Sequence, residues 1–405
     1  MSEWKSLSSI TSKIGSGSTP RGGNSVYSDS GISFIRSQNV LDMDFSTENL
    51  AFINDSQAEK LNNVIVEKND ILLNITGDSI ARCTVVPEEI LPARVNQHVS
   101  IIRCKNTEES KYVMYYLQYM KKYLLQISKV GGTRNALTKE AIGKLPIKIS
   151  DDCNKISKIL DNIDQKIQTN NQINQELEAM AKTLYDYWFV QFDFPDQNGK
   201  PYKSSGGKMV YNPELNREIP EGWGVEKLGN ITICHDSKRV PLSSHEREHV
   251  KGEIPYYGAT GIMDYVNDYI FDGDYVLMAE DGSVMTEKGT PILQRISGKN
   301  WVNNHAHVIE PVKNHSCKLL MMLLKDVSVM KIKTGSIQMK INQENMNKIV
   351  VPAIPLELLF EINQRLEVID KQQLNLIEEN KQLTQLRDWL LPMLMNGQVK
   401  VEDKA

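Results

Sequence analysis

Leu137-Thr-Lys-Glu-Ala-Ile-Gly-Lys-Leu145 recurs later in the chain as Ile341-Asn-Gln-Glu-Asn-Met-Asn-Lys-Ile349, with its apolar, glutamate and lysine positions in the same order. The two stretches lie 204 residues apart. A further pair, Ile163-Asp164 and Ile369-Asp370, matches at a shift of 206. A globular unit followed by a long helix is therefore repeated in tandem, which predicts a pseudo-two-fold protein with two similar surfaces.

Length and cysteine usage limit the class of protein. The chain has 405 residues, which is too long for one ordinary core and fits two globular domains with connectors. Its five cysteines lie far apart without a C-x-x-C pair, so neither a disulfide framework nor a zinc knuckle is expected. The chain opens on polar residues and no run approaches about 18 apolar residues, so we expect a cytoplasmic protein without a signal peptide or membrane span.

The charge of the chain is spread rather than concentrated. The net charge is -4, and residues 1–150 carry 18 basic and 15 acidic side chains. Strong DNA binding by counterion release normally needs a concentrated basic face. If the protein binds DNA, a partner is therefore expected to supply much of the phosphate contact.

The two globular regions alternate short β-prone runs with turns. Residues 1–150 contain runs such as Ile71-Leu-Leu-Asn-Ile75, and apolar positions at helical spacing predict one helix over about 111–126. Residues 220–352 repeat the pattern, with a short helix near Cys317 to Asp326. Both regions are therefore expected to be α+β domains.

The hydrophobic period then changes to a heptad between Cys153 and Trp188, a stretch of 36 residues without proline or glycine. One helix of roughly 50 Å is permitted there at the usual rise per residue. Lys166 and Asn170 would form a polar layer in the seam, which lowers stability but fixes register. The a positions of this copy are Ile156, Ile163, Asn170, Leu177 and Leu184, and the d positions include Ile159, Ile173 and Met180.

The second copy keeps the seam, with Ile362, Ile369, Leu376, Leu383 and Leu390 at the a positions. Two related helices of matching length can pack on each other, and a perpendicular pseudo-two-fold axis makes the pair antiparallel. The expected fold is α+β, with two globular domains separated by a rod of two antiparallel helices. The expected boundaries are 1–150 and 220–352 for the globular domains, 151–190 and 353–396 for the helices, 191–219 for a linker and 397–405 for a tail.

Sequence motifs of common enzymes are missing from the chain. It has no G-x-x-x-x-G-K-[ST], no G-x-G-x-x-G between a strand and a helix, no H-E-x-x-H and no G-x-S-x-G. Asn212-Pro213-Glu214 lacks the remainder of an amino-methyltransferase motif. No catalytic residue is therefore expected.

Polar loops recur at matched positions in the two copies. Asn74 to Arg82 follows one expected strand, and Met278 to Val284 follows its counterpart. Such loops can place side chains in a major groove, where Arg pairs with guanine, Asn or Gln with adenine, and Asp or Glu with cytosine. The other interpretation is a connecting turn filled with turn-forming residues.

Three further matched segments offer similar groups. Asn96-Gln-His98 corresponds to Asn303-Asn-His-Ala-His307, and Gly131 to Asn135 corresponds to Gly335 to Lys340, which can also be a glycine turn before a helix. The third pair is an early loop in each copy, Ser16 to Arg21 and Asp236 to Arg239. The candidate DNA contacts in the first copy are Ser18, Thr19, Arg21, Arg36, Asn74, Thr76, Asp78, Arg82, Asn96, Gln97, His98, Thr133, Arg134 and Asn135. Those in the second copy are Lys238, Arg239, Glu280, Asp281, Ser283, Asn304, His305, Ser336, Gln338 and Lys340.

Two other patterns receive structural interpretations. His305 and His307 could share a strand face as metal ligands, but without a third ligand at a recognisable spacing no metal site is expected. The aromatic string Tyr185-Asp-Tyr-Trp-Phe189 could stack on bases, but at the end of a heptad run it favours packing within the rod or against a partner.

Together these residues resemble the specificity subunit of a Type I restriction-modification system. The opening Glu3-Trp-Lys-Ser-Leu with Ser16 to Pro20 is similar to the start of that family's first target-recognition domain. Leu184 to Asp193, followed by Gly206 to Val210 and Glu218 to Trp223, is similar to its central region. Arg387 to Gly397 is similar to its C-terminal helix end.

The resemblance implies a non-catalytic subunit that reads a bipartite target in double-stranded DNA, one half with each globular domain, with the helix pair as a ruler. It implies two methyltransferase subunits, which use S-adenosylmethionine, and restriction subunits, which use ATP and Mg²⁺, as partners. Tyr187, Trp188 and Trp389 are the candidates for docking the methyltransferase subunits. The remaining alternative is a two-lobed adaptor that binds proteins across a coiled-coil spacer.

Overall fold

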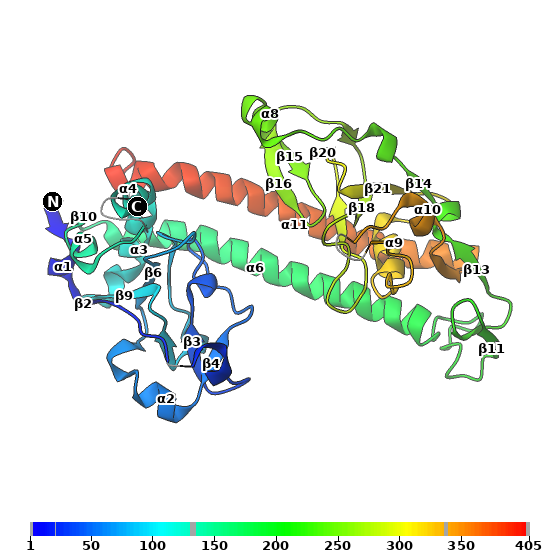
Figure 1. Cartoon of the computed structure of the whole chain (residues 1–405), viewed down its shortest axis with the longest axis horizontal. Helices are drawn as coiled ribbons and strands as arrows, with labels where there is room; N and C mark the ends of the chain where they lie inside the picture. Colours follow the sequence, from blue (N-terminus) through cyan, green and yellow to red (C-terminus); the bar gives the residue numbers. More distant parts are fainter. Residues whose placement is uncertain (1–2, 21, 130–134, 336–338, 402–405) are drawn as a thin grey trace. The chain divides into compact units, whose positions relative to one another are not determined.

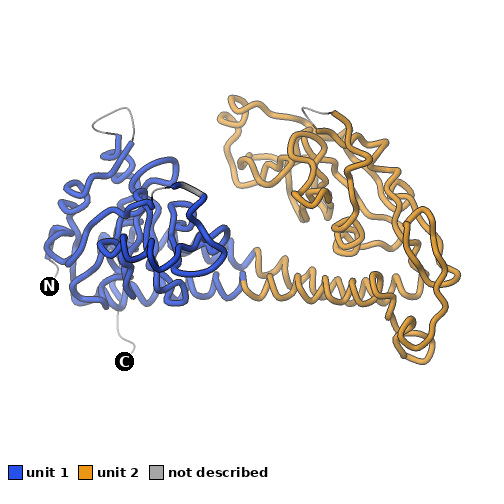
Figure 2. Tube along the Cα trace, turned by 60° about the horizontal axis from the view of Figure 1, so that its bottom comes forward, with its two compact units in different colours: residues 1–171, 378–405 blue, residues 172–377 orange. Residues whose placement is uncertain are grey.

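The computed structural model describes residues 3–20, 22–129, 135–335 and 339–401. The chain divides into two compact units (Figure 2). Unit 1 combines Met1–Asn171 with Glu378–Ala405, and unit 2 is Gln172–Ile377.

Unit 1 contains two four-stranded sheets and a two-stranded sheet among its described residues (Figure 1). Strands β3 and β8 pair in parallel, and the other pairs are antiparallel. The first sheet has the order β2 (Thr11–Ser16), β9 (Val99–Cys104), β6 (Ile71–Asn74), β7 (Cys83–Val85). The second has the order β4 (Ala51–Ile53), β3 (Ile32–Ile35), β8 (Ala93–Val95), β5 (Ile65–Val66), and β1 (Glu3–Ser6) pairs with β10 (Pro146–Ile149).

Unit 2 repeats this topology strand for strand. The parallel pair is again in the second sheet, between β15 and β20. The first sheet has the order β14 (Thr232–Cys234), β21 (Ala306–Pro311), β18 (Tyr275–Ala279), β19 (Leu293–Ile296). The second has the order β16 (Ile262–Val266), β15 (Lys251–Tyr257), β20 (Lys299–Val302), β17 (Phe271–Asp272), and β13 (Gly224–Lys227) pairs with β22 (Val350–Ala353). The predicted α+β repeat is confirmed.

The short helices explain why the sequence of residues 137–145 recurs at 341–349. Thr138 caps one of them by accepting a hydrogen bond from the Ala141 amide, and Asn342 caps its counterpart through the Asn345 amide. The helices of unit 1 are α1 (Leu7–Ile10), α2 (Asp55–Glu59), α3 (Ser110–Tyr119), α4 (Lys121–Ser128) and α5 (Lys139–Gly143). Those of unit 2 are α7 (Leu228–Ile231), α8 (Ser244–His249), α9 (Cys317–Leu324) and α10 (Gln343–Asn347). The predicted single helix over 111–126 was wrong, because Met120 leaves the helical conformation between α3 and α4.

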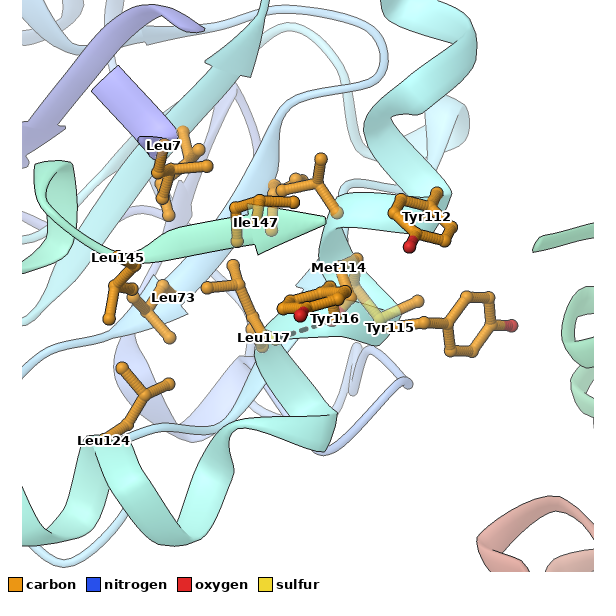
Figure 3. Packing of buried hydrophobic residues seen from close by; sticks show 14 of the residues in the cluster. Leu7, Leu73, Tyr112, Met114, Tyr115, Tyr116, Leu117, Leu124, Leu145 and Ile147 are labelled. Atoms are coloured by element: carbon orange, nitrogen blue, oxygen red, sulfur yellow. Dashed lines mark hydrogen bonds between the residues drawn. The ribbon is translucent and has the colours of Figure 1, made fainter. Parts of the chain in front are cut away.

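The core of unit 1 packs α3 against the first sheet and α1 (Figure 3). Leu7, Leu73 and Leu117 have no exposed surface. Burying such a side chain contributes about 1.5–3 kcal/mol. The Tyr115 ring points away from the other labelled side chains of the cluster (Figure 3). Its hydroxyl donates to Asp164 Oδ2 at 2.6 Å.

Two long helices, α6 (Cys153–Tyr185) and α11 (Leu356–Asn396), contribute to both units. In unit 1, Arg387 Nη1 lies 2.8 Å from Asp164 Oδ1, and Asn170 Nδ2 lies 2.8 Å from Asn380 Oδ1. Since the residue number falls along α11 as it rises along α6, the helices are antiparallel there. In unit 2, Gln373 Nε2 donates to the Asn174 carbonyl, and Arg365 lies over the Trp188 ring, which gives the same direction.

The predicted polar layer is confirmed within unit 1. Asn170 is fully buried, donates to Glu379 Oε2 and Asn380 Oδ1, and accepts from Lys166 Nζ. The prediction that Met180 faces the partner helix at a d position was wrong, because Met180 is 59% exposed while Ala181 is buried. A straight helix has 3.6 residues per turn, so a strict heptad drifts off the buried face.

The stretch expected as a linker is structured. Its strands β11 (Met209–Asn212) and β12 (Arg217–Pro220) form an antiparallel hairpin. Phe192 and Phe194 are buried in the core of unit 2, where the Phe194 and Trp223 rings stack at 5.3 Å. None of the helices described has both the length and the apolar character needed to cross a membrane.

Candidate nucleic-acid interface

The matched loops of unit 1 meet at one end of its first sheet, where β6 ends and β9 begins. The Ile75 amide donates to the His98 carbonyl at 2.9 Å, and the Leu137 amide donates to the Ile75 carbonyl at 2.9 Å. The early loop joins them, since the Gly17 amide donates to the Val99 carbonyl at 2.9 Å. Four segments that are distant in sequence therefore form one edge, called here the unit 1 edge.

Unit 2 builds an equivalent edge, with two matching backbone bonds around its central strand and a different bond to its early loop. The Glu280 amide donates to the His305 carbonyl, and the Ile341 amide donates to the Glu280 carbonyl, each at 2.8 Å. The His235 amide donates to the Val308 carbonyl at 2.8 Å and brings in the early loop. We call this the unit 2 edge.

A three-residue turn is repeated within each edge. Asn96 Oδ1 accepts from the His98 amide at 3.1 Å, and Asn303 Oδ1 accepts from the His305 amide at 2.8 Å. This local bond is the Asx turn that asparagine favours. The histidine ring then contacts the loop after the central strand, through Thr76 Oγ1 in one unit and Asp281 Oδ1 in the other. The two turns are therefore structurally equivalent.

The unit 2 edge contains a charge cluster formed by Arg239, Asp236, Glu280, His307 and Lys340. Arg239 Nη1 lies 2.6 Å from Glu280 Oε2 and donates to the Ala306 carbonyl at 2.7 Å, while its Nη2 lies 3.3 Å from Asp236 Oδ2. Lys340 Nζ lies 3.0 Å from Glu280 Oε1. The cluster ties the early loop, the central loop and the segment before α10 together.

The carboxyl groups of this cluster are held ionised. Burial would by itself raise the pKa of Asp236, but the hydrogen bond from His307 and the charge of Arg239 hold that pKa below its usual value. Burial acts in the same way on Glu280, and the hydrogen bonds from Arg239 and Lys340 lower its pKa. Burial beside the Asp236 carboxylate raises the pKa of Cys234 to about 12, so this thiol is neutral.

The two histidines considered as a metal pair have separate partners. His305 is partly exposed and faces Asp281, whereas His307 is fully buried between Asp236 and the Ile341 carbonyl. Cys234, Asp236 and His307 bring their ligand atoms within 4.8 Å of one another, the one such group among the described residues. Both ring nitrogens of His307 already have hydrogen-bond partners, and Arg239 contacts Asp236, so an internal ion-pair network accounts for this group.

The predicted DNA contacts fall into three sets by exposure. Exposed are Asp78, Gln97, Asn135, Lys238, Ser283, Asn304 and Lys340. Partly buried are Ser18, Thr19, Arg36, Thr76, Arg82, His98, Arg239, Asp281 and His305. Buried are Asn74, Asn96 and Glu280, and Arg21, Thr133, Arg134, Ser336 and Gln338 lie outside the described residues.

The buried set corrects the sequence interpretation. Asn74 has no exposed surface and donates to the Ser37 and Val40 carbonyls, so it fixes a neighbouring turn. Asn96 holds its own turn, and Glu280 holds Arg239 and Lys340. These side chains therefore have structural roles within the fold.

The three aromatic candidates for docking a partner differ in their exposure. The Tyr187 and Trp389 side chains are exposed, at 39% and 56%. Trp188 is 3% exposed and packs beside Phe189 in the core of unit 2, so its expected partner contact is corrected. The turn between α6 and the hairpin is a π-helical turn, Asp186–Val190, and it directs successive side chains to opposite environments.

Asp236, Asn303 and His307 take part in the edge but are not among the individual contacts predicted from the sequence, although Asn303 and His307 lie in a matched segment. Asn303 had a detectable signal, because asparagine occupies the first position of both turns. Asp236 and His307 had none, since the matched positions in unit 1 carry different residues.

Comparison with known proteins agrees with the repeat. The chain is 32% identical over 163 residues to a putative Type I restriction enzyme specificity subunit of Haemophilus influenzae, covering 40% of this chain and 41% of that protein. It is 26% identical to the Type I restriction enzyme MjaIX specificity subunit of Methanocaldococcus jannaschii, covering 77% of this chain and 74% of that protein. The crystal structure of a Type I restriction-modification S subunit from M. genitalium shares the fold, with a TM-score of 0.55 at 14% identity over 100% of this chain and 97% of that chain. The family model described as the Type I restriction modification DNA specificity domain matches residues 1–179 and 220–385, and the chain belongs to this family.

Proposed function

We propose that this protein is the DNA-recognition subunit of a Type I restriction-modification complex, with each globular unit reading one half of a bipartite target. The observation that carries the proposal is the repeated edge, in which matching backbone bonds join the loop after the central strand to the histidine turn and to the segment before α5 or α10, with the early loop beside them. Exposed amide, hydroxyl and charged groups at both edges are the types that read base edges in a major groove.

The helix pair is proposed to set the unread spacer between the half-sites. Both α6 and α11 continue without interruption through residues of unit 1 and unit 2. The buried Asn170 layer fixes their register within unit 1, because any slip would leave its hydrogen bonds unmade. The proposed domain division follows from this role: 1–150 and 220–352 read DNA, and 151–190 and 353–396 space them.

The protein is proposed to act without catalysis of its own, in the cytoplasm, with two methyltransferase subunits and restriction subunits. S-adenosylmethionine, ATP and Mg²⁺ would then serve the partners. Exposed apolar side chains on the helices include Trp389 and Ile377. They support a protein-docking role, because a partner would remove their apolar surface from water.

Methylome sequencing of cells with and without the gene tests the proposal. The expected result is a bipartite methylated motif that disappears on deletion and returns on complementation. Replacing residues 1–150 by those of another family member should change one half of the motif only. An unchanged methylome, together with no salt-dependent binding to duplex DNA when a methyltransferase is present, would contradict the proposal and leave the adaptor interpretation.

A further inference from the structure

Gln97 and Asn304 occupy the same position in the two units. Each is the central residue of an Asn-x-His turn whose first residue accepts from the amide of the third. The carbonyl of that third residue accepts from Ile75 in unit 1 and from Glu280 in unit 2. The turn is therefore anchored at both ends to the sheet, and its central side chain is at the tip.

Burial separates the central residue from its neighbours. Gln97 and Asn304 are exposed, whereas Asn96 and Asn303 are buried. The Asn304 carboxamide has no hydrogen-bond partner among the residues that the structure describes. Gln97 Nε2 makes one long contact, 3.4 Å from His98 Nε2. Each edge thus offers a carboxamide on a rigid turn, with its donor and acceptor available.

The neighbouring polar groups at the tip are already engaged. The ring nitrogen Nδ1 of His98 faces Thr76, and that of His305 faces Asp281. In unit 2 the Arg239 guanidinium is held by Glu280 and Asp236. The carboxamides of Gln97 and Asn304 therefore keep a donor and an acceptor available at the tip of each turn.

This chemistry selects one base. A carboxamide can donate to N7 and accept from the N6 amino group of adenine in the major groove, and no other base pair presents that adjacent pattern in the same order. We propose that Gln97 and Asn304 are equivalent specificity residues, each reading an adenine in the half-site of its own unit. The inference rests on the proposed function and adds the identity of the base.

The test compares motifs methylated in cells that carry the full-length variants. Gln97→Ala should make one adenine position degenerate in one half-site, and Asn304→Ala should do so in the other. The isosteric changes Gln97→Glu and Asn304→Asp should shift the preference toward cytosine, because a carboxylate accepts from its N4 amino group. Asn230→Ala is the matched control, since this exposed carboxamide on α7 donates to Glu226 of β13, outside the edge.

A binding assay with the assembled complex gives an independent measurement. A duplex with 7-deazaadenine at the affected position, which lacks the N7 acceptor, should bind the wild type about 5- to 150-fold more weakly. The corresponding alanine variant should bind both duplexes equally. If any alanine variant unfolds at a lower temperature than wild type, the isosteric variants decide the outcome.

The two levels of the proposal fail differently. A motif that stays fully specified in both alanine variants, or a loss of specificity at a position that is not adenine, would overturn the assignment of these residues. A methylome that does not respond to deletion of the whole gene would instead overturn the proposed function.

Discussion

Replacing Arg239 by methionine tests whether the charge cluster holds the unit 2 edge together. The Arg239 and Glu280 side chains are only 10% and 11% exposed. The change would remove the 2.6 Å ion pair to Glu280 and the 2.7 Å hydrogen bond to the Ala306 carbonyl, while the methionine keeps most of the apolar contact of the side-chain stem.

The size of the destabilisation depends on the ion pair that Glu280 keeps after the substitution. Removing one partner of a buried ion pair costs about 3–5 kcal/mol, because the other charge is left buried. Lys340 still neutralises Glu280 at 3.0 Å, so the expected loss lies at the lower end, about 3 kcal/mol. For a unit of this size that corresponds to a fall of about 6–12 °C in Tm.

Calorimetry of the full chain, with hydrogen exchange resolved by peptide, measures this loss and locates it. Arg239→Met should lower the unfolding temperature of unit 2 and increase exchange around Asn303 and Lys340, with unit 1 unchanged. Glu280→Gln alone should also destabilise, and the double variant should cost about 1–3 kcal/mol less than the sum. Lys238→Met is the control, since this exposed neighbour should change stability by less than about 0.5 kcal/mol.

A loss below about 1 kcal/mol for Arg239→Met, or additive single variants, would refute the argument. Such a result would mean that water or backbone rearrangement replaces the guanidinium. The cluster would then have no structural role at the edge.

Four further predictions follow from other parts of the molecule. Asn170→Leu should lower the stability of unit 1 by about 1–3 kcal/mol in thermal unfolding, because Asn380 and Glu379 lose their buried hydrogen-bond partner. The double variant Asn170→Leu with Asn380→Leu should recover part of that loss. Trp389→Ala should weaken co-purification with methyltransferase subunits without changing Tm, because Trp389 is exposed. Trp188→Ala should instead lower the free energy of unfolding by about 3–5 kcal/mol, because Trp188 is buried. The reverse pattern would contradict the assigned burial. The pKa values of Asp236 and Glu280 are lowered in the folded state, so their ionised carboxylates stabilise the fold above their usual pKa of about 4. This stabilisation is lost as the pH falls through the folded-state pKa values. The difference in the free energy of unfolding in urea between wild type and Asp236→Asn should therefore close on acidification. Deleting one heptad from each long helix should shorten the unread spacer in the methylated motif while the specified bases persist, and an unchanged spacer would refute the ruler.

The sequence predicted the repeat, the α+β class and the antiparallel helices because these depend on patterns that span many residues. Matched caps such as Thr138 and Asn342 and matched heptads recur wherever the same element recurs. The break at Met120 escaped prediction because no proline or glycine marks it. The predicted burial of Met180 was wrong because a strict seven-residue repeat drifts off the buried face of a helix with 3.6 residues per turn.

Prediction of the edges succeeded for segments and failed for individual side chains. The loops at Asn74, Asn96 and their counterparts do converge, because strand order brings the ends of β6 and β9 together. Residue type does not say where a side chain points, however. Asn74 turns inward to two carbonyls, while Gln97 at the tip of a similar polar loop stays exposed.

The last turns of α11 have a consequence for biosynthesis. Leu391, Leu394 and Met395 are buried in the hydrophobic cluster of unit 1, although they are synthesised after the whole of unit 2. While the chain is still emerging from the ribosome, unit 2 has all of its residues before unit 1 does. The N-terminal half must therefore wait, with part of its apolar surface uncovered. A stop codon that removes Leu391, Leu394 and Met395 would damage the half that was translated first.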